Sequence, residues 1–274
     1  MISSILGVDH IGHGVRDRDR MCSFYRDALR FGRVLAEMPL EDHPPIHGLL
    51  RTEKAIHSAM VVGGEAGGPT VALFHATTPA PRPIRRDPRY GDIGVAKLTF
   101  AVSDLDSFCR DKGSLVDLFF APKTVALANS GEYHFAYGRD PEGNLLEFVS
   151  GSTPVEAAAP RSGAASAGAP ILRSVGVAIT DLERSLAFYR DILGFDTVVE
   201  APHESFSGLV DELTGMAGTN VRSCLLANSR GQGMVELFEV TKPRGRSIPF
   251  GTQWGDFGYL QLCLYADNGK ELIA

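Results

Sequence analysis

The chain has 274 residues, of which 44% are hydrophobic and 22% are charged, an ordinary balance for a soluble globular protein. Its formal net charge of −6 argues against a nucleic-acid partner, and no apolar run approaches the ~20 residues that a membrane-spanning helix needs. The N-terminus lacks the pattern of a secretory signal and the four cysteines form no C-x-x-C pair, which favours a reduced, cytoplasmic protein.

The first predicted unit opens with an alternating strand that leads into an amphipathic helix, in GVDHIGHGVRDRDRMCSFYRDALRF (7–31). Asp17 stands where an N-cap side chain would accept a backbone N–H. The pattern returns at a constant offset of 164 in ILRSVGVAITDLERSLAFYRDILGF (171–195), with Asp181 at the cap. Because strand, cap and helix all match, the two segments are predicted to be copies of one module.

Two weaker copies lie at 94–113 and 257–274, and strand-rich segments that resemble hairpins fill the spaces between the copies. The predicted unit is therefore a βαβββ module used four times, which gives an α+β fold of tandem modules. The first three copies have room for a whole module. For the fourth, only 257–274 remains, so we expect either that the chain is truncated or that another chain completes that sheet.

Two linkers separate the modules. Residues 151–170 are rich in Ala, Gly, Ser and Pro and are predicted to be flexible. Residues 77–92 join the first two modules and contain Arg82, Arg85, Arg86 and Arg89. These arginines predict either a solvated basic loop or contacts with a phosphate-bearing substrate tail near the pocket.

The linkers predict two double-module domains, the second incomplete. The first domain is expected at 1–150, with modules at 5–78 and 94–150; the second is expected at 171–274, with a module at 171–242 and a partial module at 257–274.

The chain resembles the vicinal oxygen chelate superfamily, which includes glyoxalase I, methylmalonyl-CoA epimerase, extradiol ring-cleaving dioxygenases and bleomycin-resistance proteins. The segments that carry the resemblance are DHIGHGV (9–15), SFYRDALRF (23–31), DPEGNLLEFV (140–149), VGVAITDLERSLAFYRDILGF (175–195) and GMVELFEV (233–240). It implies that two modules pair around a cleft that is open at one side. In that cleft, the first strand of a module can offer a His and the last strand a Glu to a divalent metal ion.

In the first domain, the resemblance assigns ligand positions to His10 and Glu147, but Lys97 and Ala72 occupy the other two. One interpretation is a site for a divalent ion (Fe, Mn, Zn or Ni) that His10 and Glu147 hold. The other is a metal-free pocket in which the Lys97 ammonium pairs with Glu147, because an ammonium is a poor ligand. His134, on a neighbouring strand, is either a general base or replacement ligand, or a plain strand residue.

In the second domain, the matching positions are Ser174, either Tyr259 or Leu260, and Glu236. One acid without a His predicts no metal there. Ser174, Glu236 and Arg222 are instead candidate substrate-binding residues, with Arg222 capping Glu236.

Histidines outside these positions are expected to be structural. His13 is predicted to be a hydrogen-bonded core residue, and His57 a surface residue in a loop.

The resemblance implies a small-molecule enzyme, most simply an isomerase or lyase that works next to a carbonyl. Glu147 would be the base or a metal ligand, and His10 and Lys97 would stabilise the enolate oxygen. The alternatives are a non-catalytic binder of the bleomycin-resistance kind and an extradiol dioxygenase. The expected partner is a small-molecule substrate or ligand, and a homodimer is compatible with the pattern.

Overall fold

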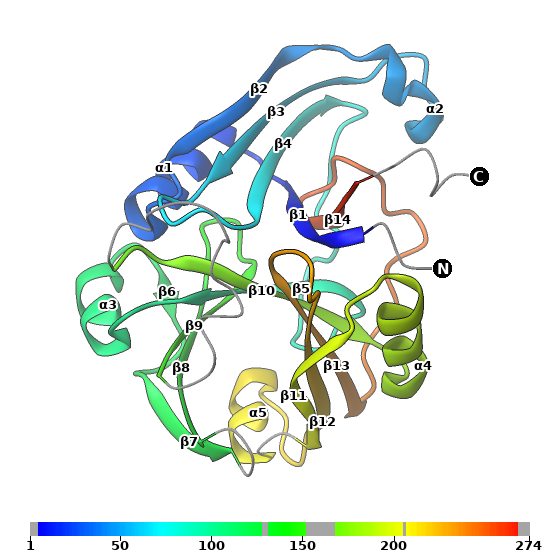
Figure 1. The fold of residues 1–274 in the computed structure, drawn as a ribbon. Helices are drawn as coiled ribbons and strands as arrows, with labels where there is room; N and C mark the ends of the chain where they lie inside the picture. The colour runs from blue at the N-terminus through cyan, green and yellow to red at the C-terminus, as the bar shows by residue number, and fades with distance from the viewer. Residues whose placement is uncertain (1–4, 128–130, 152–167, 205–206, 268–274) are drawn as a thin grey trace.

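The computed structural model describes residues 5–127, 131–151, 168–204 and 207–267. The strands form a five-stranded and a nine-stranded sheet. In Figure 1 the five-stranded sheet lies in the upper part of the view and the other below it. No helix within these ranges is long and apolar enough to cross a membrane.

Three segments of the chain have the order of a βαβββ module. The first comprises β1 (Ile5–Gly14), α1 (Arg18–Leu29), β2 (Arg33–Asp42), the short helices η1 (Pro44–Ile46) and α2 (His47–Leu50), β3 (Ile56–Gly63) and β4 (Thr70–Thr78). The second comprises β5 (Gly94–Ala101), α3 (Leu105–Lys112), β6 (Asp117–Leu118), β7 (Lys123–Leu127), β8 (Gly131–Arg139) and β9 (Leu145–Ser150). The third comprises β10 (Ile171–Ile179), α4 (Leu182–Ala187) with its π-helical continuation (Phe188–Ile192), β11 (Thr197–Glu204), α5 (Ser207–Thr214), β12 (Asn220–Ala227) and β13 (Met234–Lys242).

The fourth copy contributes β14 (Gly258–Ala266). The helix expected after this strand, and most of the linker at 151–170, lie outside the described residues.

The aspartates that end each first strand begin the helices as predicted. The side chains of Asp17 and Asp181 accept the backbone N–H groups of Arg20 and Arg184 at 2.9 and 3.0 Å, and Asp104 does the same at α3. Each cap satisfies a donor that the first helical turn leaves without an intrahelical partner.

The pairing of the modules differs from the expected one. The second module pairs with the third, because β5 lies antiparallel to β10 at the centre of the nine-stranded sheet. The strand order is β11-β12-β13-β10-β5-β9-β8-β6, and the ninth strand, β7, also pairs with β8. The first module pairs with β14 in the order β14-β1-β4-β3-β2. The sequence repeat identifies the modules but not their partners, because every first strand presents a similar edge for pairing.

The main core fills the space where the helices and the inner faces of both sheets meet. It contains residues of all the modules, and Phe31 of the first packs edge-to-face on Phe100 of the second, with ring centroids 5.4 Å apart. The two sheets therefore share one hydrophobic core.

A buried polar contact also joins the two sheets. The side-chain amide of Asn144, in the turn between β8 and β9, donates a hydrogen bond at 2.7 Å to Nε2 of His13 on β1, which confirms the predicted core histidine. Asp140 of the same turn accepts backbone N–H groups from Glu142 and Asn144. Burial lowers the pKa of His13 to about 4 and raises the pKa of Asp140 to about 6, since the interior disfavours both charged forms.

Candidate functional site

A buried cluster of charged side chains lies at the centre of the nine-stranded sheet. The Lys97 ammonium on β5 lies 2.7 Å from a Glu147 oxygen on β9 and 2.9 Å from a Glu236 oxygen on β13. It also donates a hydrogen bond to the Tyr137 hydroxyl on β8 at 3.0 Å. The ion pair with Glu147 that the sequence offered as one interpretation is present, and Glu236 is a second partner that was not expected.

Neighbouring hydroxyl groups complete the hydrogen bonding of Glu147. Thr99 donates to one carboxylate oxygen at 2.7 Å and Tyr133 donates to the other at 2.9 Å. The side chains of Lys97 and Glu147 are each only 1% exposed. Every oxygen of this carboxylate therefore has a partner, as a buried charge requires.

The charges of the cluster shift one another's protonation. Burial disfavours the ammonium of Lys97, but Glu147 and Glu236 more than offset this and raise its pKa. Burial opposes ionisation of Glu147 as well, and Lys97 nevertheless holds the pKa of that carboxyl below its ordinary value. For Glu236, burial prevails over the attraction of Lys97 and raises the pKa.

Strand register explains why these side chains meet. Thr99 lies beside Glu147 in the parallel pair of β5 and β9, and opposite Ser174 in the antiparallel pair of β5 and β10. Gly176 lies opposite Lys97 and beside Glu236. A Cβ atom at 176 would lie 2.4 Å from Cγ of Lys97, so the glycine makes room for the lysine side chain.

The four ligand positions that the resemblance assigned to two separate domains thus lie in one place. Lys97, Glu147, Ser174 and Glu236 surround the middle of the β5–β10 pair. The Ser174 hydroxyl is buried and has no hydrogen-bond partner within the described ranges.

Aromatic rings and a helix cover this cluster. Tyr90 stacks on Phe238 with ring centroids 5.1 Å apart and meets Tyr137 edge-to-face at 6.4 Å. Val210 and Leu213 of α5 pack against the same apolar groups. The ammonium and Glu147 are consequently shielded from solvent.

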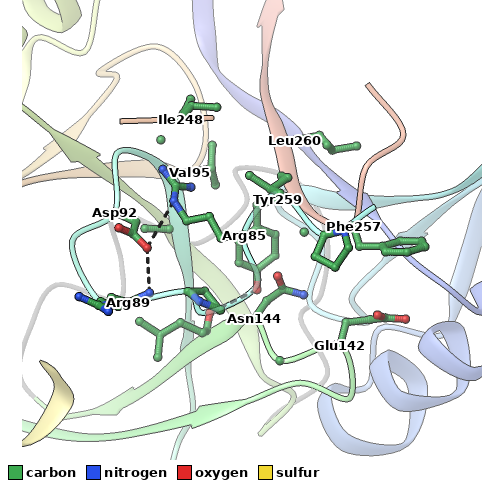
Figure 2. Close-up of a pocket in the computed structure, with 18 of the residues that line it drawn as sticks. Arg85, Arg89, Asp92, Val95, Glu142, Asn144, Ile248, Phe257, Tyr259 and Leu260 are labelled. Carbon is green, nitrogen blue, oxygen red and sulfur yellow. Dashed lines mark hydrogen bonds and ion pairs between the residues drawn. The ribbon is translucent and has the colours of Figure 1, made fainter. Parts of the chain in front are cut away.

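A pocket of about 650 Å³ lies beside the cluster, between the two sheets (Figure 2). Its walls come from residues 83–96 (the end of the linker and the start of β5), the turn at 142–145 and the segment at 248–260. Figure 2 shows Tyr259 and Phe257 among Asn144, Glu142 and Arg85. Leu213 of α5 also lines this pocket.

Comparison with known proteins agrees with this architecture. The sequence model of the Glyoxalase/Bleomycin resistance protein/Dioxygenase superfamily matches residues 7–148 and 171–268. The chain belongs to this superfamily.

Solved structures of glyoxalase I share this fold. The crystal structure of glyoxalase I from Zea mays is 17% identical, with a TM-score of 0.55 over 94% of this chain and 73% of that one. A mutant of the same enzyme is 16% identical, with a TM-score of 0.54 over 94% and 74%. A glyoxalase family protein from Bacillus cereus is 19% identical, with a TM-score of 0.45 over 53% and 94%. A search of curated proteins found no match.

A divalent metal ion does not fit the site in which the superfamily positions converge. The Lys97 nitrogen lies within 3 Å of both carboxylates, so a cation of the chain itself stands between the candidate ligands. An ammonium cannot ligate, and it repels a second cation at that distance. Across the described parts of the chain, no group of three or more His, Cys, Asp and Glu side chains is arranged to hold a metal ion.

Three of the expected site residues lie elsewhere. His10 is on β1 of the other sheet, where its ring contacts Asp9 at 2.7 Å, so the structure does not bring it to Lys97 and Glu147. This follows from the module pairing, which separates the first module from the second.

His134 and Arg222 also lie away from the cluster. Because successive side chains of a strand point to opposite faces, His134 lies on the face of β8 opposite to that of Tyr133. There it contacts Ser150 at 3.2 Å. Arg222 does not cap Glu236; its guanidinium lies 2.7 Å from Glu183 and 3.7 Å from Glu239.

The five-stranded sheet repeats the geometry of the site with other residues. The residue opposite Gly12 is Gln261, and not Tyr259 or Leu260 as expected. A Cβ atom at position 12 would lie 2.4 Å from Cγ of Gln261, the same distance as between a Cβ atom at 176 and Cγ of Lys97. Trp254 donates a hydrogen bond to this glutamine at 3.1 Å.

His57, expected on the surface, is buried on β3 beside Trp254, because it lies inside the strand and not in the loop before it.

Proposed function

We propose that this protein binds a small organic molecule and that it does so without a metal ion, as a sequestering protein of the bleomycin-resistance kind. The observation that carries the proposal is the Lys97 ammonium, 2.7 and 2.9 Å from the two carboxylates at the superfamily's ligand positions. Because this cation is part of the chain, it permanently occupies the place between the two acids where a metal ion would bind. The pocket beside the cluster offers a binding space for such a molecule.

A ligand screen tests this proposal. The full chain is treated with a chelator and screened against aromatic and aliphatic small molecules by thermal shift, and hits are measured by calorimetry. We expect compounds that bind equally well with chelator and with added Mn²⁺, Ni²⁺ or Zn²⁺, and that are recovered unchanged. Binding that requires an added ion, or conversion of the bound compound, contradicts the proposal.

A second candidate is proton transfer next to a carbonyl, of the isomerase or lyase type. The observation that favours it is Glu236, whose pKa is raised by burial and whose side chain is 17% exposed, against 1% for Glu147. A carboxylate with a raised pKa that solvent can reach suits a general base, and the adjacent ammonium would stabilise an enolate oxygen. Glu236, not Glu147, would then be the base.

Isotope exchange separates the two candidates. If the second holds, the protein exchanges the hydrogen next to the carbonyl of a bound ketone or aldehyde for deuterium in D₂O. Glu236→Gln should then slow this exchange at least ~100-fold. Glu53→Gln, in an exposed loop, should leave it unchanged. No exchange above the rate in buffer rules out the enzyme and leaves the binder.

A further inference from the structure

The pocket between the two sheets has a charge opposite to that of the whole chain. Five arginines line it, Arg16, Arg85, Arg86, Arg89 and Arg139, and only two carboxylates, Asp92 and Glu142. The lining therefore carries a net charge of +3, whereas the chain carries −6. A concentration of positive charge in a concave site attracts anions and raises their local concentration.

Both carboxylates of the pocket are already engaged by arginines. Asp92 lies 2.7 Å from a nitrogen of Arg246 and 3.4 Å from one of Arg85. Glu142 forms an ion pair with Arg16. These acids therefore cannot neutralise the remaining cations. Within the described residues, the exposed side chains of Arg86 and Arg139 form no ion pair.

The rest of the lining is mostly apolar and includes five aromatic residues, Tyr90, Phe119, Trp254, Phe257 and Tyr259. The guanidinium groups of Arg16 and Arg139 lie over the rings of Phe257 and Phe119, 4.5 and 5.2 Å from their centroids. A guanidinium that rests on a ring face keeps its N–H edge free for a planar acid. The volume of about 650 Å³ is that of a site for a small organic molecule.

We infer that this pocket binds an anionic small molecule with an aromatic body. Arg86 and Arg139 hold its acidic group (a carboxylate, sulfonate or phosphate), and the aromatic side chains contact its body. The inference rests on the proposed binding function and adds the chemical class of the ligand. It also explains the arginines of the linker at 77–92, because Arg85, Arg86 and Arg89 line the pocket.

The test compares two fluorescent probes that differ by one charge, 8-anilinonaphthalene-1-sulfonate and its uncharged analogue N-phenyl-1-naphthylamine. We expect the full chain to bind the sulfonate at one per chain and more tightly than the neutral probe. The double variant Arg86→Gln/Arg139→Gln should weaken sulfonate binding about 10-fold or more, since it removes two charge-assisted contacts. Its affinity for the neutral probe should stay within about twofold.

Matched variants show whether charge is the cause. Arg110→Gln removes an exposed arginine of α3 outside the pocket and should bind both probes as the wild type does. Arg86→Lys/Arg139→Lys should recover most of the sulfonate affinity. Circular dichroism and thermal melting of each variant identify any loss of fold.

The outcomes separate this inference from the proposed function. Equal affinity for both probes, or sulfonate binding that the double glutamine variant leaves unchanged, overturns the anion site but not metal-independent binding. If the sulfonate binds only with an added divalent ion, the proposed metal-independent function is wrong. The inference of an anion site is then kept as long as the sulfonate still binds more tightly than the neutral probe. Failure to bind either probe overturns the inference.

Discussion

Position 97 carries a lysine where the corresponding positions of the other modules carry His10, Ser174 and Gln261. Register makes these four positions equivalent, yet only the lysine places a charge between two acids. One ammonium cannot fully balance two carboxylates in a buried site. The raised pKa of Glu236 and the lowered pKa of Glu147 are the physical result, since the better-bonded acid keeps its charge.

Removal of the ammonium should destabilise the fold. Lys97→Met leaves Glu147, 1% exposed, and Glu236 without their cation. We expect the free energy of unfolding in urea to fall by about 3–5 kcal/mol, the cost of breaking a buried ion pair. Lys97→Met/Glu147→Leu should recover a large part of that loss. Equal stability of Lys97→Met and the wild type would show that the pair contributes nothing.

Replacement of the ammonium by an imidazole should create a metal site. Lys97→His places a neutral nitrogen donor beside Glu147 and Glu236, a donor set that suits Zn²⁺ or Mn²⁺. Calorimetry should detect one divalent ion per chain in this variant. The wild type and Lys97→Met should bind none at this place. Tight binding of one ion at these carboxylates in the wild type would mean that Lys97 does not block it.

Asp140 should make stability depend on pH. Its pKa in the folded chain is about 6, against 3.8 for the free side chain, so the fold prefers the protonated form. This stabilisation is present below pH 3.8 and is lost as the pH rises through 6. Asp140→Asn has no such loss, and its stability relative to the wild type should rise by about 2 kcal/mol between pH 4 and pH 7. Urea unfolding at both pH values measures the gain. A constant difference between the two proteins contradicts it.

At the level of elements, the sequence predicted the modules and their helix starts, because strand alternation, capping aspartates and the repeat are local signals. Asp17 and Asp181 cap the helices as predicted. The sequence did not predict which first strands pair, because pairing depends on packing between distant segments. Because of that error, the predicted site included His10 and omitted Glu236.

Gly176 should be required for the pairing of β5 with β10. A Cβ atom there would lie 2.4 Å from Cγ of Lys97, a carbon near the backbone that the ion pairs hold in place. We expect Gly176→Ala to lower the free energy of unfolding by about 1–3 kcal/mol through overpacking. Gly48→Ala in α2 meets no atom within 4 Å and should be neutral or slightly stabilising. If the two variants have the same free energy of unfolding in urea, the close approach of Lys97 to Gly176 does not require a glycine at this position.

For the whole molecule, the pocket was the part of the site that sequence patterns predicted least. Its walls come from 83–96, 142–145 and 248–260, which only the tertiary fold brings together. From sequence alone, the arginines of the linker favoured a solvated loop over contacts with an acidic substrate group. In the structure Arg85, Arg86 and Arg89 line the pocket, and Arg86 and Arg89 are also exposed.

Arg246 connects two walls of the pocket that are far apart in the chain. Its guanidinium donates to Asp92 at 2.7 and 2.8 Å and to Asp87 at 3.0 Å, which ties the segment after β13 to the linker before β5. The hydrogen bonds to Asp92, the less exposed of its two carboxylate partners, raise the pKa of Arg246 above its ordinary value. The side chain of Arg246 is 37% exposed, so solvent screens part of this attraction.

We therefore expect Arg246→Gln to lower the free energy of unfolding by only about 1–2 kcal/mol. Because the linker loses its hydrogen bonds to Arg246, trypsin should also cleave the native protein faster after Arg89. Arg244→Gln is the matched control, since Arg244 is exposed and forms no ion pair within the described residues. Urea unfolding and limited proteolysis measure the two effects. If Arg246→Gln resists trypsin as well as Arg244→Gln does, this arginine does not hold the pocket wall in place.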